Sequence, residues 1–76
     1  MRRSPLDPAR PLASLREVAG LDLTRGAEAR GVRPPSEHEA ERIGAQIRLS
    51  TLLAAAEAWG LDVEIVARPK KDLDLT

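Results

Sequence analysis

Hydrophobic residues in the last third of the chain follow two different periods. Between Leu49 and Trp59 they recur at steps of three and four, which predicts an amphipathic helix. The face that they share consists of Leu49, Leu52, Leu53, Ala56 and Trp59. Ser50 or Thr51 is expected to cap this helix through its side-chain oxygen, and Gly60 to end it in the left-handed conformation.

From Leu61 the period changes to two, which predicts a strand that ends before Pro69. One side of this strand carries Leu61, Val63, Ile65 and Ala67. A lone strand needs a partner, and no second clearly alternating segment exists in the sequence. We therefore predict that residues 63–67 pair antiparallel with a second copy of the chain. The alternative is a strand that folds back on its own N-terminal segment, around residues 5–15.

Trp59 has two interpretations at this stage. It can be the central core residue beneath the strand. Alternatively, it can be an exposed anchor in the dimer interface, together with Leu61, Val63, Ile65 and Ala67. Its place on the face shared with Leu52 and Ala56 favours the core, and a core shared across a two-fold axis would satisfy both interpretations.

The first two thirds of the chain predict short helices between turns. Residues 1–12 contain three prolines and no periodicity, so we expect a flexible arm. Helices are expected at residues 14–19, capped by Ser14, and at residues 24–30, where Gly26 weakens the helix. The Pro34-Pro35 pair predicts an extended entry to a third helix at residues 36–47, capped by Ser36. The predicted organisation is an arm (1–12), a domain with its strand (13–69) and a charged tail (70–76).

Composition restricts the class of protein. With 76 residues and one aromatic residue, Trp59, the chain forms a single small domain whose core would gain from dimerisation. It has no cysteine and one histidine, so we expect no disulfide, no metal site and no cofactor. No apolar run is long enough to span a membrane, and the first residues, MRRS, lack the apolar stretch of a secretion signal, which predicts a cytoplasmic protein.

Enzymatic chemistry is not expected. His38 stands between Glu37 and Glu39, but successive residues of a helix point in different directions and do not form an acid–base pair. The sequence has no glycine-rich phosphate loop, no nucleophile elbow and no metal-ligand spacing. We predict no catalytic residue.

The segment ERIGAQIRLSTLLAAAEAWGLDVEIVARP resembles the C-terminal half of small Xre/Cro-repressor-like helix-turn-helix proteins, particularly antitoxins of toxin–antitoxin pairs. The matching positions are Gly44, Ile47, Arg48, Leu49, Ser50, Thr51, Leu52, Ala58, Gly60, Leu61, Val63 and Ile65, and upstream Gly20, Leu21, Ala27, Glu28, Gly31 and Val32. The resemblance covers roughly residues 15–69. It implies a mainly α-helical, lambda-repressor-like bundle of four or five short helices, with one C-terminal strand that pairs across a dimer.

The chain departs from this family where DNA would be read. Leu23 stands where the family usually has a phosphate-binding glutamine, and Gly26 where it has a core leucine. The turn before the third helix is one residue longer and holds the two prolines. The third helix presents three carboxylates, Glu37, Glu39 and Glu41, against one arginine, Arg42, which predicts repulsion from a phosphate-lined groove.

Two functional hypotheses follow. The first is a dimeric DNA-binding transcriptional regulator, or an antitoxin that regulates its own operon, and it would read DNA with the third helix. Its candidate contacts are Arg33, Ser36, His38 and Arg42, with Arg2 and Arg3 as an arm on the backbone or in the minor groove. The second is a protein-interaction module whose acidic third helix binds a basic partner, such as a toxin. Net charge is zero, but we favour the first, because a few well-placed arginines and helix N-termini can outweigh a neutral total.

Overall fold

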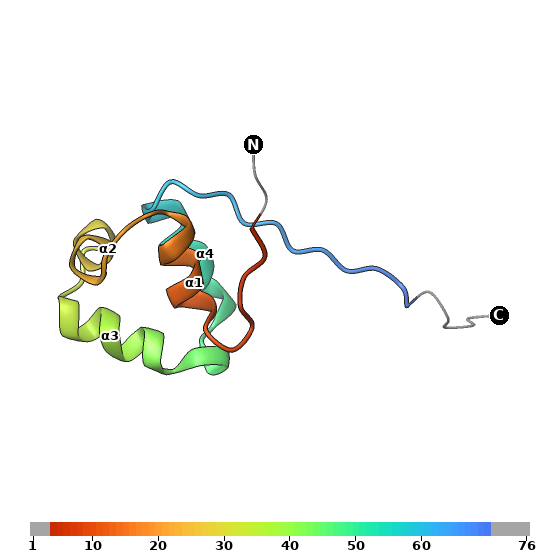
Figure 1. Ribbon diagram of the computed structural model, residues 1–76, viewed down its shortest axis with the longest axis horizontal. Helices are drawn as coiled ribbons and strands as arrows, with labels where there is room; N and C mark the ends of the chain where they lie inside the picture. The colour runs from red at the N-terminus through yellow and green to blue at the C-terminus, as the bar shows by residue number, and fades with distance from the viewer. Residues whose placement is uncertain (1–3, 71–76) are drawn as a thin grey trace.

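The computed structural model describes residues 4–70, and the regular elements in this range are helices (Figure 1). In chain order they are α1 (Pro11–Val18), α2 (Leu23–Arg30), α3 (Pro34–Arg42), the 3-10 turn η1 (Gly44–Gln46) and α4 (Leu49–Ala58). Helices α1 and α4 pack side by side, and α2 and α3 together form the other end of the domain. The prediction of a mainly helical domain is confirmed.

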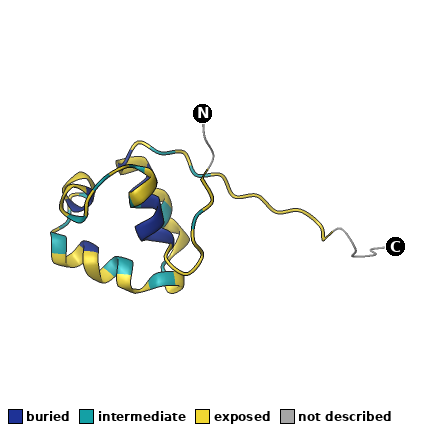
Figure 2. Ribbon diagram, viewed as in Figure 1, coloured by how far each residue is buried: buried dark blue, intermediate teal, exposed yellow. Residues whose placement is uncertain are grey.

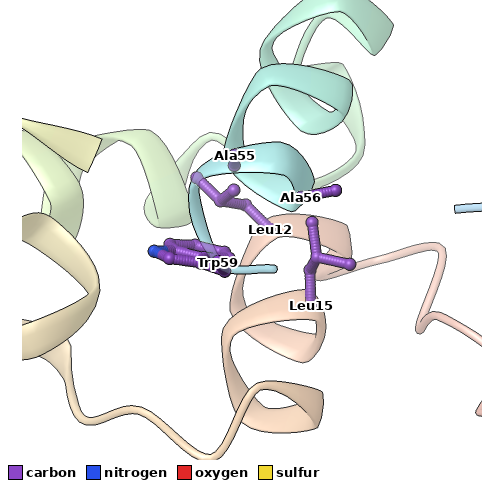
Figure 3. Close-up of a cluster of buried hydrophobic side chains, with 5 residues drawn as sticks. All are labelled: Leu12, Leu15, Ala55, Ala56 and Trp59. Atoms are coloured by element: carbon purple, nitrogen blue, oxygen red, sulfur yellow. The ribbon is translucent and has the colours of Figure 1, made fainter. Parts of the chain in front are cut away.

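The hydrophobic core lies between α1 and α4. Leu12 and Leu15 of α1 pack against Ala55, Ala56 and Trp59 at the end of α4 (Figure 3). Two alanines on α4 let α1 approach closely, and the largest buried stretch of the chain accordingly lies on α1 (Figure 2). The prediction that Trp59 is a core residue is confirmed, since only 8% of it is exposed.

The buried face of α4 is rotated from the face that the periodicity predicted. Leu49 and Leu53 remain 52% and 42% exposed, while Ala55, which was not on the predicted face, is fully buried. The helix turns Ala55 and Ala56 toward α1, in the same cluster as the ring of Trp59.

Trp59 also fixes α2. Its indole nitrogen points toward α2 in Figure 3, and it donates a 2.9 Å hydrogen bond to the backbone carbonyl of Gly26. A Cβ at position 26 would lie 2.7 Å from Cδ of Arg16 and 3.4 Å from Cζ2 of Trp59. Gly26 weakens α2 by propensity, but its missing side chain allows α2 to approach α1 and the indole.

The N-terminal ends of α1 and α4 differ from the prediction. Helix α1 starts at Pro11, so Pro11 and Leu12 belong to the domain and not to the arm, and Leu12 is only 1% exposed. Ser14 does not cap the helix; it lies within it, and its hydroxyl donates to the Pro11 carbonyl and accepts from the Asp7 N–H. The expected cap at the start of α4 is also wrong, since Arg48 stands there without a side-chain hydrogen bond.

The prolines before α3 have the opposite role from the predicted one. Pro34 and Pro35 are the first residues of α3, and Arg33, not Ser36, is its N-cap residue. Proline suits this position because the first turn needs no N–H donor and its φ is already helical. The helix ends at Arg42, and η1 replaces the predicted continuation to residue 47.

After α4 the chain stops being helical where predicted. Gly60 has a φ of +70°, and the N–H of Leu61 bonds the Ala56 carbonyl at 2.8 Å. Leu61 and Val63 are half-buried against the core and Asp62 is exposed, as a period of two requires.

No part of residues 61–70 forms a strand in the single chain, so the predicted strand is not shown. Beyond Val63 the described chain runs away from the helices, and Ile65 and Val66 are 66% and 64% exposed (Figure 1).

Gly26→Ala provides a test of the contact between α1, α2 and α4. Helix propensity alone predicts a gain of about 1 kcal/mol in stability. We expect instead a loss of about 1–3 kcal/mol, because the added methyl group meets the stem of Arg16, whose guanidinium is held at its far end. Urea denaturation followed by circular dichroism measures the difference. Ala29→Gly, at an exposed position of α2, is the control for propensity, and a stabilised Gly26→Ala variant would contradict this packing.

Candidate functional site

Helices α2 and α3 are joined by a tight turn of three residues. Gly31 adopts a φ of +73°, which ends α2, and the N–H of Val32 bonds the Ala27 carbonyl at 3.0 Å. Arg33 is extended and leads directly into α3. The turn places α3 across the end of the domain, with most of its outer side exposed to solvent (Figure 2).

Glu37 lies on the inner side of α3 and is completely buried. Its Oε1 accepts a hydrogen bond from Nη1 of Arg30 at 2.5 Å, which joins α3 to α2. Its second oxygen, Oε2, has no hydrogen-bond partner. A buried carboxylate is stable only when it is paired, so the contact with Arg30 is essential to the packing of α3.

Glu41, one turn later on the same side of α3, pairs with α1. Nε and Nη2 of Arg16 donate to its two carboxylate oxygens at 2.8 Å and 3.0 Å. The third nitrogen, Nη1, donates to the Leu21 carbonyl at 2.8 Å, so the whole guanidinium is engaged. The bidentate pair is largely removed from water, with side chains 16% and 10% exposed.

The two carboxyl groups titrate differently. Burial, reinforced by the neighbouring carboxyl group of Glu41, raises the pKa of Glu37 to about 7, although Arg30 opposes the shift. Burial is also the largest single cause acting on the pKa of Glu41, and it acts upward. The hydrogen bond from Arg16, the neighbouring Glu37 and the positive charge of Arg16 together outweigh burial, so the pKa of Glu41 is lowered.

The prediction that α3 presents three carboxylates to solvent is therefore wrong for two of them. Glu37 and Glu41 point inward, because α3 has only Ala40 and its two prolines as apolar residues and the domain offers arginines to its inner side. The third, Glu39, accepts two hydrogen bonds from Arg42 at 2.8 Å and 3.1 Å on the surface. This contact lowers the pKa of Glu39.

The four predicted DNA contacts of this region all lie on the solvent-exposed surface. Arg33, Ser36, His38 and Arg42 are all exposed. The exposed charged residues of positions 33–43 are Arg33, Glu39 and Arg42, so positive charges exceed negative charges on this surface. Arg2 and Arg3 lie outside the described residues.

The predicted dimer residues are only partly accessible. Ile65 and Ala67 are exposed and Leu61 and Val63 are half-buried, whereas Trp59 is enclosed in the core of its own chain. A groove runs beside them. It is lined by residues from four parts of the chain, among them Pro5, Leu6, Val18, Leu49, Val63 and Ile65.

Sequence reasoning missed the cluster formed by Arg16, Arg30, Glu37 and Glu41. Two signals could have found it: the spacing of four residues between Glu37 and Glu41, and a helix with Ala40 as its one apolar residue after the prolines. Such a helix needs polar side chains as well as Ala40 to dock against the domain.

Residues 4–70 contain no group of three His, Cys, Asp or Glu side chains that could hold a metal ion. None of the helices in this range combines the length and apolar character needed to cross a bilayer. Comparisons with protein families, with curated proteins and with solved structures found no match.

Arg30→Met tests whether the buried pair holds α3. The substitution leaves Glu37 buried without a counter-charge, so we expect a loss of about 3 kcal/mol at pH 8. The loss should be smaller at pH 5.5, where a protonated Glu37 needs no counter-charge. Chemical denaturation at the two pH values gives both quantities. Arg42→Met removes an exposed arginine from the Glu39 pair and is the matched control, with little change expected. Equal losses in the two variants would show that the buried pair does not hold α3.

Proposed function

We propose that the chain is a dimeric DNA-binding regulator that uses α2 and α3 as a helix-turn-helix and α3 as its reading helix. The observation that carries this proposal is the orientation of α3. Its two inner carboxylates are engaged by Arg16 and Arg30, and its outer side carries Arg33, Ser36, His38 and Arg42. The repulsion from phosphate that the sequence predicted is thereby reduced to one carboxylate.

The chemistry of the outer side suits a DNA groove. Arginine binds the O6 and N7 acceptors of guanine with two hydrogen bonds, and serine and arginine also bind phosphate oxygens. Arg42 is held by Glu39 in the free protein, in a contact that is exposed on both sides. Exposed ion pairs are weak, so Arg42 can exchange Glu39 for a base or a phosphate at little cost.

The same observation argues against a module that binds a basic partner through an acidic α3. With Glu37 and Glu41 directed inward, Glu39 is the one carboxylate left on the exposed side of the helix, and it is already paired. On the sequence resemblance alone, we extend the proposal to an antitoxin that represses its own operon.

The dimer is proposed to form through residues 63–67. Ile65 and Val66 are adjacent and both exposed, so an extended chain presents them on opposite sides. A second copy that pairs antiparallel would satisfy the backbone groups and cover one side. The exposed side chains of Val18 and Leu49, which line the adjacent groove, would extend the interface.

DNA binding is tested by fluorescence anisotropy with DNA from the region upstream of the gene, at several salt concentrations, against a scrambled duplex. We expect tight binding to the specific duplex that weakens linearly on a log–log salt plot. Arg42→Ala should lower specific affinity about 5- to 150-fold, as expected for the loss of a base contact. Arg68→Ala removes the same charge from the exposed C-terminal segment and is the control. Weak binding that is indifferent to sequence would contradict the proposal.

Dimerisation is tested by sedimentation velocity. The wild-type chain should sediment with twice the 8.3 kDa mass of one chain, and Ile65→Lys should shift it to the monomer, because a charge in the paired segment is costly to bury. Ala29→Lys adds the same charge to the exposed side of α2 and should leave the dimer intact. A wild-type monomer at all concentrations would rule the interface out.

A further inference from the structure

Helix α3 is attached to the domain mainly by charged groups, with Ala40 as its one apolar contact with the core. Glu37 is the one buried residue among its nine, and Ala40 is its one apolar residue apart from the prolines. Arg30 binds the helix to α2 and Arg16 binds it to α1. The position of α3 therefore depends on the ionisation of two carboxyl groups.

These carboxyl groups lie one helical turn apart on the same side of α3. When both are ionised, each can only accept hydrogen bonds, and Oε2 of Glu37 is buried without a partner. A proton on Glu37 removes this defect, because its O–H can donate to the carboxylate of Glu41, which follows one turn later and also faces inward. Oε1 of Glu37 continues to accept from Arg30.

We infer that Glu37 and Glu41 act as a proton-sharing pair that positions α3 against α1 and α2, and that loss of the shared proton loosens the helix. Glu37 is thus a positioning residue for the outer side of α3. The packing of α3 by this pair follows from the geometry described above and does not depend on the proposed function. Only the consequence for DNA binding rests on the proposed function.

The charged groups around the pair set the direction of the effect. Arg16 faces it from α1 and Arg30 from α2, while His38 acts on Glu41 from within α3 and Glu17 acts on Arg16. Burial is the largest cause that raises the pKa of Glu37, from an ordinary 4.5 to about 7. The folded chain therefore binds this proton more tightly than the unfolded chain. The resulting stability is fully present below pH 4.5 and is lost as the pH rises through 7.

Glu37→Gln is the decisive variant. Its amide oxygen can accept from Arg30 and its NH₂ group can donate to Glu41, so it reproduces the protonated pair at every pH. From the two pKa values, the wild-type unfolding constant should rise about tenfold more than that of Glu37→Gln between pH 6 and pH 8. Urea denaturation at a series of pH values measures the ratio. Glu39→Gln, on the exposed side, should keep the wild-type dependence.

Parallel pH profiles for the wild type and Glu37→Gln would overturn the inference. Carbon-13 NMR of the Glu37 carboxyl group in the wild-type chain gives an independent answer and requires no variant to fold. A titration midpoint near 7 supports the shared proton, and a midpoint near 4.5 refutes it.

The consequence for DNA is measured separately by anisotropy at pH 6 and pH 8. The affinity of the wild type should fall by a larger factor than that of Glu37→Gln over this interval. His38 is present in both proteins, so the comparison isolates the contribution of Glu37. If neither protein binds DNA, the proposed function fails while the stability and NMR results still decide the inference; if both bind with equal pH dependence, the link between the pair and the reading helix is wrong.

Discussion

The contact between Trp59 and Gly26 determines how the helices are arranged. Trp59 is the single aromatic residue of the chain, and its ring completes the core formed by Leu12 and Leu15. Its N–H reaches the carbonyl of Gly26 in α2, where the absence of a side chain permits the approach. Because α3 follows α2 after only three residues, the placement of α2 by this contact also places α3.

A chain with so little large apolar material must hold its remaining helix by other means. The ion pairs of Glu37 and Glu41 hold α3 against the domain. They contribute less to folding stability than apolar contacts would, because burying charged groups costs free energy. In return, the two arginines fix the rotation of α3 about its own axis. That rotation decides which side chains of the helix face outward, and it is the basis of the proposed function.

Local features of this fold could be predicted from the sequence, and contacts between distant residues could not. Gly60 ends α4 as expected, and the period of two after it agrees with the half-burial of Leu61 and Val63. The predicted and observed helix starts differ at Pro11 and Pro34 because proline, which interrupts a helix, is also favoured in its first turn. The role of Gly26 depends on Trp59, which is distant in sequence, so no local pattern revealed it. The inward direction of Glu37 had a local signal in its spacing from Glu41, but that spacing does not identify Arg16 and Arg30 as the partners.

The position of the lone indole has a spectroscopic consequence. Trp59 is the sole tryptophan of the chain, and it sits where α1, α2 and α4 meet, with its N–H bonded to a buried carbonyl. Its fluorescence therefore comes from one environment, without contributions from other sites. A separation of α2 from α4 would expose the ring to water and shift its emission to longer wavelength. The protein thus carries a natural optical reporter at the junction on which its architecture depends.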